Sequence, residues 1–389
     1  MIEYRRLKKS ESYSYHLLVS DAYKGGKPDP KAVVHPRDLK IIRGVFDKGE
    51  LKSALAIRDY RILVGGKRIR MGGIAGVGTF SKSRKKGYAA ALLTRCIEEM
   101  RTLGYAVSIL FPFSYKFYRE FGWELAGQHA VHSIVNRTHL PRYPEAVLVR
   151  PICASDAGRI ASCYRRYAAQ YNCMISRTAH DWERLFMRWK KDRVAIYPIE
   201  KGPKIIGYFV IRKSDDRRTA TVAEFAAHDH IAAKAMIGFL AKLPKNVGEI
   251  VINAPDKPSI WQHLNEPCGA MSQKPLCQFR IIDLVKALTL RGYPRGAKGT
   301  IIFGLAENVA LWNGGIWKLT VKHGKATVRP TRQEPEFVID QRSFAQLYLG
   351  YHSLWDLSAA GLAYVKKRRA FDEADAIFGN QRQYILDHF

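Results

Sequence analysis

The chain has 389 residues, too many for one ordinary hydrophobic core, and we expect two or three domains. Hydrophobic residues make up 47% and aromatic residues 11% of it, which excludes a disordered protein. No run approaches the roughly 20 apolar residues of a membrane helix, and the charged N-terminus does not resemble a signal peptide, so a soluble, cytoplasmic protein is expected.

The formal net charge is +29, spread through the chain and densest in residues 1–145. Such an excess attracts either nucleic acid or smaller phosphorylated anions, unless it is only a general solubility bias. No basic stripe interleaved with aromatic residues is present, so nucleic acid is the second interpretation of the charge and not the expected partner. The cysteines form no C-x-x-C pair and predict reduced, mostly buried thiols and no metal site. They are Cys96, Cys153, Cys163, Cys173, Cys268 and Cys277.

The first predicted elements are a helix over residues 10–23, a Gly/Pro-rich loop over 25–30, and strands over 51–57, 61–64 and 69–74. Gly65 and Gly66 predict a hairpin turn into the last of these strands. Gly72 and Gly73 lie inside that strand, where glycine indicates a bulge or the close approach of another group.

Residues 76–89 combine the end of a strand, a turn with four cations, and a glycine that opens a long amphipathic helix. The first N–H groups of a helix are unpaired and lie at the positive end of its dipole. Arg84, Lys85 and Lys86, together with Gly87, therefore predict a cradle for a phosphate or pyrophosphate. The plain alternative is a solvated basic turn, and the flanking strand and helix favour the cradle. Gly104 is expected to end the helix.

A buried strand over 106–111 and a short helix over 113–120 complete a mixed α/β unit. Two motifs in this region carry a family resemblance. Arg84-x-x-Gly87-x-Ala89 resembles the Q/R-x-x-G-x-G/A motif of the GNAT superfamily of N-acetyltransferases. The segment from Phe113 to Trp123 is similar to the F-Y-x-x-F-G-(W/Y) segment of the Eis (enhanced intracellular survival) acetyltransferases.

Three further signals lie where the Eis family has them: residues 279–283, residues 344–351, and the ending Asp387-His388-Phe389. The resemblance thus runs from end to end. It implies a mixed α/β (α+β) fold with two tandem GNAT-fold acyltransferase domains and a sterol-carrier-protein-like domain. The expected domains are a catalytic one over 1–145, a degenerate second one over 146–285 and the C-terminal one over 286–389.

The second domain is expected to have strands over 147–151, 205–211, 220–227 and 250–253 and helices over 154–171 and 232–243. Before the latter helix stands His228-Asp229-His230, which offers no glycine for phosphate approach. We therefore expect this domain to bind no cofactor.

The C-terminal domain is expected to have strands over 299–305, 308–313, 315–321 and 326–329 and helices over 341–349, 353–360 and 363–370. In the resembled family this domain scaffolds a hexamer and delivers the C-terminus to the active site. A lipid-carrying role stays open.

The resemblance implies acetyl-CoA as co-substrate and no metal. Backbone N–H groups of residues 84–89 are expected to bind its pyrophosphate, and backbone groups of residues 77–79 its pantetheine arm and thioester. Ser114 is expected to orient the catalytic acid or to contact CoA. The full set of predicted cofactor-binding residues is Val77, Gly78, Thr79, Arg84, Lys85, Lys86, Gly87, Tyr88, Ala89 and Ser114.

Tyr118 is the predicted general acid, because its register with Phe121-Gly122-Trp123 matches the Eis pattern and a phenol is protonated at neutral pH. Packing in an aromatic cluster is the commoner fate of such a residue, and Tyr115 competes for the role. The resemblance makes the C-terminal carboxylate of Phe389 the base, acting directly or through water. Chain ends usually fray, but this one carries apolar residues able to pack. Among the histidines, His129 and His132 are only near the end of the active domain.

The acceptor is expected to be a primary amine of a small molecule, aminoglycoside-like or a polyamine, or of lysine. The net charge works against a polycation. The local acids that could favour one are Asp21, Glu120, Glu124 and Asp387. The alternatives from other classes are a non-catalytic protein that binds a polyanion or nucleic acid, and a lipid-binding scaffold.

Overall fold

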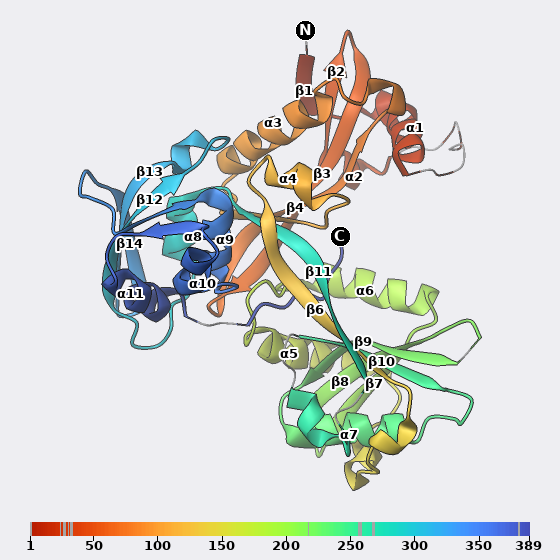
Figure 1. The fold of residues 1–389 in the computed structure, drawn as a ribbon. Coiled ribbons are helices and arrows are strands. Elements are labelled where there is room, and N and C mark those ends of the chain that lie inside the picture. The colour runs from red at the N-terminus through yellow and green to blue at the C-terminus, as the bar shows by residue number, and fades with distance from the viewer. Residues whose placement is uncertain are drawn as a thin grey trace.

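A sheet of eleven strands runs through residues 2–281 and carries the candidate site (Figure 1). The structure is a computed structural model that describes residues 2–23, 25, 29, 31, 34–216, 218–255, 259–266, 269–379 and 382–389. Most of the predicted loop over 25–30 and Cys268 lie outside the described residues. The strand order is β1-β2-β3-β4-β5-β11-β6-β10-β9-β8-β7. The strands are β1 (Ile2–Arg6), β2 (Ile42–Asp47), β3 (Glu50–Val64), β4 (Lys67–Thr79), β5 (Val107–Leu110), β6 (Glu124–Ile134), β7 (Ala195–Lys201), β8 (Lys204–Lys213), β9 (Thr219–Ala227), β10 (Glu249–Ala254) and β11 (Ala270–Ile281).

The first domain places helices on opposite faces of β2 to β4. On one face α1 (Ser12–Tyr23) buries Leu18 against Leu51 and Ala54. On the other, α3 (Tyr88–Thr102) buries the apolar stripe predicted for it, including Leu92 and Met100. The short helices of this domain are α2 (Pro36–Leu39) and α4 (Tyr115–Arg119). Gly104 follows α3 with φ +84°, as its predicted role at the helix end requires.

Two predictions for the first domain were wrong in detail. The strands expected over 51–57 and 61–64 are the single strand β3, because the charged Asp59 between them points to solvent and pairs there with Arg70 of β4 (2.9 Å). Of the two alternatives predicted for Gly72 and Gly73, the bulge is wrong, because the β3–β4 register shifts opposite Ala54–Ala56 and places the bulge at Gly76 (φ +61°). The other alternative, a close approach, is what the structure has, since a Cβ at Gly72 or Gly73 would lie 2.5 or 2.6 Å from Met100 or Phe389.

β6 and β11 form a long antiparallel ribbon that joins the first two domains (Figure 1). The end of β11, residues 278–281, pairs with β5, whereas the end of β6, residues 130–134, pairs with β10. A strand that follows the second domain in sequence therefore completes the sheet of the first domain next to β5.

The second domain packs α5 (Ala157–Ala168) and α6 (Ala179–Lys191) on one face of β7–β10 and α7 (His230–Ala241) on the other. The strand expected over 147–151 is instead a 3₁₀ turn, Pro144–Leu148, which packs on α7, followed by one bridge from Val149 to Ile199. No helix was predicted at α6, although Trp182, Leu185 and Trp189 lie on one buried face of it.

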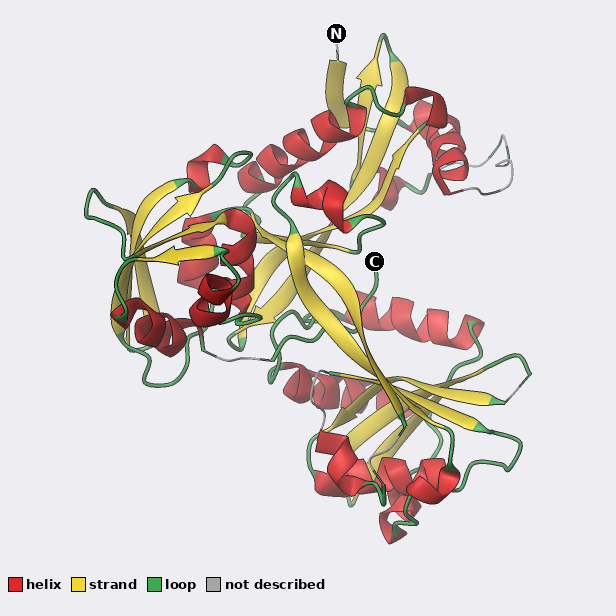
Figure 2. Ribbon diagram, viewed as in Figure 1, coloured by secondary structure: helices red, strands yellow, loops and turns green. Residues whose placement is uncertain are grey.

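The C-terminal domain has a five-stranded sheet in the order β14-β13-β12-β15-β16, covered by helices (Figure 2). Its elements are α8 (Leu284–Leu290), β12 (Gly299–Ala306), β13 (Gly315–Lys322), β14 (Lys325–Pro330), β15 (Phe337–Asp340), α9 (Gln341–Leu349), α10 (Leu354–Ala359), β16 (Ala363–Val365) and α11 (Arg369–Phe378). Its core is continuous with the face of β4, β5 and β11 that carries Met71, Ile109 and Phe279.

Two elements of this domain differ from the prediction. Residues 308–313 contain a 3₁₀ turn, Leu311–Asn313, because Trp312 and Asn313 donate side-chain hydrogen bonds to Ile282 instead of continuing a strand. Residues 363–370 begin with β16, which pairs with β15, and the helix starts only at Arg369.

Candidate active site

The candidate site begins where β4 and β5 part. The two strands pair in parallel from Met71–Val107 to Ile74–Leu110; β4 then continues to Thr79 while the chain leaves β5 toward α4. Past this point the backbone groups of β4 that face away from β3 have no ladder partner on β5. Parting parallel strands create an opening into which a ligand can extend along exposed N–H and C=O groups.

The predicted backbone ligands lie on this part of β4. The N–H of Phe80 donates to Lys52 of β3 (3.2 Å), so by strand alternation Thr79 and Val77 turn their own backbone groups away from β3. The hydroxyl of Tyr23 donates to the carbonyl of Val77 (3.2 Å). At Gly78 a Cβ would lie 2.8 Å from Leu18, so glycine lets α1 pack directly on the strand.

The basic turn follows at once. A 3₁₀ turn, Ser81–Ser83, leads through Lys85 (φ +63°) to Gly87 (φ +81°), which caps α3. The side chains of Arg84, Lys85 and Lys86 are exposed, and a Cβ built at Gly87 meets no atom within 4 Å. Open space above the unpaired N–H groups of a helix start, with cations beside it, fits a pyrophosphate.

Two residues of the turn have structural partners. The buried side chain of Tyr88 donates its hydroxyl to Asp47 (2.6 Å), which leaves only its backbone to face a ligand. Asp21 accepts hydrogen bonds from the N–H (2.5 Å) and hydroxyl (3.1 Å) of Ser81. This contact fastens the basic turn to α1, so Asp21 has a structural partner and is not free to bind an amine.

Tyr118 lies on α4, directly after β5. Its side chain is 3% exposed and packs against Phe113, Phe117 and Trp123 at ring-centroid distances of 5.4, 5.1 and 6.4 Å. Burial raises the pKa of this phenol, which holds its proton at neutral pH. Tyr115 is only half-buried.

Ser114 is the N-cap of α4. Its hydroxyl accepts the N–H of Phe117 (3.3 Å) and so fixes the start of the helix that carries Tyr118.

The C-terminal segment reaches this opening from the third domain (Figure 1). The ring of Phe389 lies 5.0 Å from that of Tyr60 on β3 and 5.1 Å from that of Phe111, the residue after β5. A Cβ on Gly73 of β4 would lie 2.6 Å from the Phe389 ring, so glycine is needed for this approach. His388 stacks on Phe111 at 4.4 Å.

A buried ion-pair network holds the C-terminal segment in place. Arg177, 1% exposed, pairs with Glu224 through both terminal nitrogens (2.8 Å each) and with Asp387 through Nε (3.0 Å). Its guanidinium also stacks on the rings of Tyr164 and Trp182. Asp387 is two residues from the C-terminus, so Arg177 fixes where Phe389 can lie.

The other acids and histidines proposed from the sequence are mostly engaged. Glu124 is held by Arg119 (2.7 Å), and Asp387 by Arg177, whereas Glu120 is exposed. His132 is buried against Trp261 with a ring-centroid distance of 4.0 Å. Sequence reasoning missed His388, whose stacking on Phe111 depends on the fold of the C-terminal segment and has no local signal.

The second domain has no counterpart of the basic turn at the equivalent place. β9 connects to α7 through only His228 and Asp229, and the Asp229 carboxylate itself accepts the N–H of Ala232 (2.8 Å). A fixed carboxylate thus occupies the helix start where the first domain leaves space for an anion.

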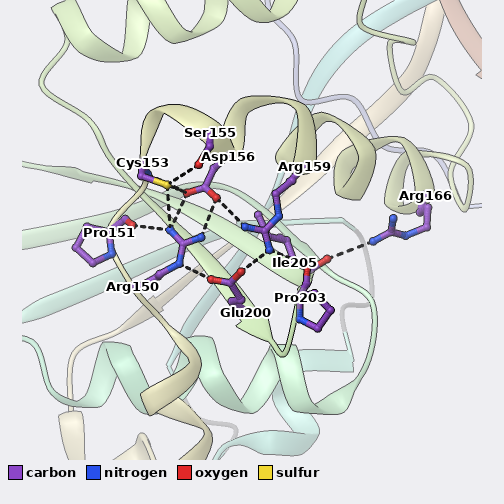
Figure 3. Close-up of polar contacts among 10 residues, drawn as sticks. All are labelled: Arg150, Pro151, Cys153, Ser155, Asp156, Arg159, Arg166, Glu200, Pro203 and Ile205. Atoms are coloured by element: carbon purple, nitrogen blue, oxygen red, sulfur yellow. Dashed lines mark hydrogen bonds and ion pairs between the residues drawn. The ribbon is translucent and has the colours of Figure 1, made fainter.

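A cluster of charges elsewhere in the second domain is structural (Figure 3). Arg150 donates to both oxygens of Asp156 (2.7 Å each) and to Glu200 (2.5 Å), and Arg159 pairs with the same two carboxylates. The thiol and N–H of Cys153 also donate to Asp156. Two guanidinium groups thus balance two carboxylates and fasten the start of α5 to the β7–β8 hairpin.

Three family models match successive parts of the chain. A model described as an acetyltransferase (GNAT) domain matches residues 3–126, a second GNAT acetyltransferase model matches residues 173–281, and a sterol carrier protein domain matches residues 284–386. The chain is also 24% identical over 368 residues to an uncharacterized N-acetyltransferase of Streptomyces avermitilis, covering 89% of this chain and 88% of that protein.

Solved structures share the fold over the full length of both chains. A GCN5-related N-acetyltransferase from Anabaena variabilis superposes with a TM-score of 0.90 at 21% identity. Eis1 from Mycobacterium abscessus superposes with a TM-score of 0.82 at 22% identity.

These findings define a GNAT-family acetyltransferase built from two tandem GNAT-fold domains and a C-terminal sterol-carrier-protein-like domain. Within that class the chain is Eis-like in its architecture, since it shares its fold over the full length with Eis1. The family and fold class expected from the motifs are therefore confirmed, and the fold implies acetyl-CoA as co-substrate. The described helices include none long and apolar enough to cross a membrane. The boundaries at 145/146 and 285/286 stay predictions.

Proposed function

We propose that this chain transfers the acetyl group of acetyl-CoA to a primary amine of a small molecule or of lysine, in the first domain. One observation supports the proposal: the basic turn follows β4, Tyr118 lies on the helix directly after β5, and the ring of Phe389 packs on Gly73 of β4 and on Phe111 after β5. These are the groups that donor binding, leaving-group protonation and amine deprotonation each require.

The donor is held mainly by the backbone. N–H groups from Arg84 to Ala89 bind the pyrophosphate, and the three exposed cations of the turn add attraction. Backbone groups of Val77 and Thr79 that face away from β3 hold the pantetheine arm and thioester, whereas the carbonyl of Gly78 accepts a hydrogen bond from Ser53 of β3. Ser114 positions α4 through its cap. A polyanion-binding or lipid-scaffold role is not favoured, because the same groups fit acetyl-CoA and the family models are those of acetyltransferases.

The transfer is direct. The terminal carboxylate of Phe389 takes a proton from the ammonium, directly or through water, and the amine nitrogen attacks the thioester carbonyl. The new C–N bond forms, the C–S bond breaks, and Tyr118 donates its hydroxyl proton to the leaving thiolate. The second proton that the nitrogen loses on becoming an amide returns to the Tyr118 phenolate through water, which restores the acid. Because burial raises the pKa of Tyr118, the phenol is protonated throughout the neutral range and available for that step.

The second domain has a structural role in this proposal and binds no acetyl-CoA, because Asp229 already occupies the start of α7. The C-terminal domain holds the segment that ends in Phe389. By family resemblance the chain assembles as a homo-hexamer in the cytoplasm.

The catalytic roles are tested by two variants with the donor site intact. Tyr118→Phe and a chain extended by two glycines beyond Phe389 should both bind acetyl-CoA like the wild type in calorimetry. Both should lose at least about 100-fold in acceptor-dependent CoA release. Unchanged CoA release in the extended chain would exclude the terminal carboxylate as base, and wild-type rates in Tyr118→Phe would exclude Tyr118 as acid.

A further inference from the structure

A small cavity lies beside the C-terminal segment. It has a volume of about 240 Å³ and lies between β3, α6 and the last residues of the chain. Its polar lining consists of Tyr60, Asp181, Arg184, Arg188, Asp387 and His388. Tyr60 also contacts the ring of Phe389 (5.0 Å), so the cavity adjoins the residue that bears the terminal carboxylate.

The cations of this cavity are available to a ligand. Arg184 and Arg188 are one turn apart on α6 and both are exposed. Among the described residues, neither guanidinium takes part in an ion pair, in contrast to Arg177, whose donors are used by Glu224 and Asp387. Two arginines at i and i+4 lie on the same side of a helix and can bind one carboxylate together.

The carboxylates of the cavity are occupied by neighbours. Oδ2 of Asp181 accepts hydrogen bonds from the N–H (2.8 Å) and hydroxyl (2.7 Å) of Thr178, the N-cap of α6, and Asp387 is paired with Arg177. Phe389, which bears the terminal carboxylate, adjoins the cavity through its ring contact with Tyr60. A ligand that extends from the pair of guanidinium groups past Tyr60 therefore approaches the residue that bears this carboxylate.

From this arrangement we infer that the acceptor is a small amine that also carries a carboxylate, and that Arg184 and Arg188 bind this carboxylate while the amine faces Phe389. The inference rests on the proposed function and names its substrate class. The cavity is smaller than the roughly 300–1,000 Å³ of sites for drug-sized ligands, which favours an amino-acid-sized acceptor over an oligosaccharide. Polycations are disfavoured because the two arginines repel them.

The test compares amines that differ only by a carboxylate. Tyrosine is paired with tyramine and 5-aminopentanoate with pentylamine, with spermidine as a polycation, and CoA release by the full chain is measured for each. We expect at least one acid-bearing amine to exceed its partner by about tenfold or more in kcat/KM. In Arg184→Gln/Arg188→Gln this ratio should collapse through a higher KM for the acid-bearing amine, with kcat little changed.

The matched control is Lys190→Gln/Lys191→Gln, which removes the same charge from the same helix but outside this cavity and should preserve the ratio. The inference is overturned if spermidine or the acid-free amines are the better substrates, if no amine of the panel is acetylated, or if both double variants act alike. Calorimetry with acetyl-CoA distinguishes a failure of the proposed function from a failure of the inferred acceptor class. Absence of donor binding defeats the proposed function, whereas donor binding with another acceptor preference defeats only the acceptor class.

Discussion

Two adjacent glycines of β4 have opposite neighbours, and this makes them a matched pair of probes. Gly73 lies under the ring of Phe389, whereas a Cβ on Gly72 would lie 2.5 Å from Sδ of Met100 in α3. Neighbouring strand residues face opposite sides of a sheet, so one position reports on the C-terminal segment and the other on the core.

Gly73→Ala should displace Phe389 and lower kcat by about 10- to 100-fold, with acetyl-CoA binding and stability nearly unchanged. Gly72→Ala should lower the free energy of unfolding by about 1–3 kcal/mol and leave kcat close to that of the wild type. Steady-state kinetics and urea unfolding distinguish the two. Equal kinetics in both variants would mean that the position of Phe389 does not matter for turnover.

His132 gives a stability prediction that is independent of catalysis. It is buried in β6 against Trp261, and burial lowers its pKa to about 4. In the unfolded chain His132 has the ordinary pKa of about 6.5, whereas in the folded chain its ring is protonated only at lower pH. The contribution of the neutral His132 ring to the free energy of unfolding is therefore fully present above about pH 6.5 and is lost as the pH falls toward 4.

Between about pH 7 and pH 4.5 the free energy of unfolding of the wild type should fall by about 2 kcal/mol more than that of His132→Phe. The phenylalanine ring keeps the contact with the Trp261 ring and cannot be protonated. Urea unfolding at the two pH values measures the difference. Parallel losses in the two proteins would show that His132 is not held neutral by the fold.

At the scale of elements, the basic turn and α3 could be predicted from the sequence because their signals are local. The cations, Gly87 and the apolar stripe of α3 all lie within one short stretch. The position of the C-terminal segment could not be predicted, because Arg177 meets Glu224 and Asp387 from 47 and 210 residues away. The resemblance implied a role for Phe389, but nothing local shows that it packs on Gly73.

Tertiary contacts also explain a wrongly predicted strand, whereas the helix α6 was missed despite a local signal. The segment 308–313 resembles a strand because its four central residues are apolar. However, the side chain of Asn313 accepts a hydrogen bond from the N–H of Leu284 (2.9 Å). For α6 the local signal existed, since Thr178 and Asp181 form a capping box ahead of a tryptophan-rich stripe. The place of β11 between β5 and β6 has no signal in either strand alone.

Arg177 joins the C-terminal segment to the second domain, and its removal should affect both stability and turnover. Arg177→Met leaves Glu224 and Asp387 buried without their cation, which should cost about 3–5 kcal/mol of unfolding free energy. Arg177→Met/Glu224→Gln/Asp387→Asn, which removes the buried charges together, should regain most of that stability but not kcat, because the segment is no longer fixed. Urea unfolding and steady-state kinetics test this; full recovery of kcat in the triple variant would show that the ion pairs do not position Phe389.

At the scale of the whole molecule, the proposed function has the three domains share one catalytic centre. The first supplies the donor turn and Tyr118, the second supplies α6 and Arg177, and the third carries the chain that ends at Phe389. β11 and β6 tie the first two together in a single sheet, so the site depends on the complete chain (Figure 1). In this proposal only the first of the two GNAT-fold domains binds acetyl-CoA.

The most direct test of this account is a calorimetric titration of the full-length protein with acetyl-CoA. We predict one site per chain, which is lost in Arg84→Ala/Lys85→Ala/Lys86→Ala/Gly87→Val and is unaffected by Asp229→Ala in the second domain. Two sites per chain, or unchanged binding in the first-domain variant, would contradict the assignment of the donor site.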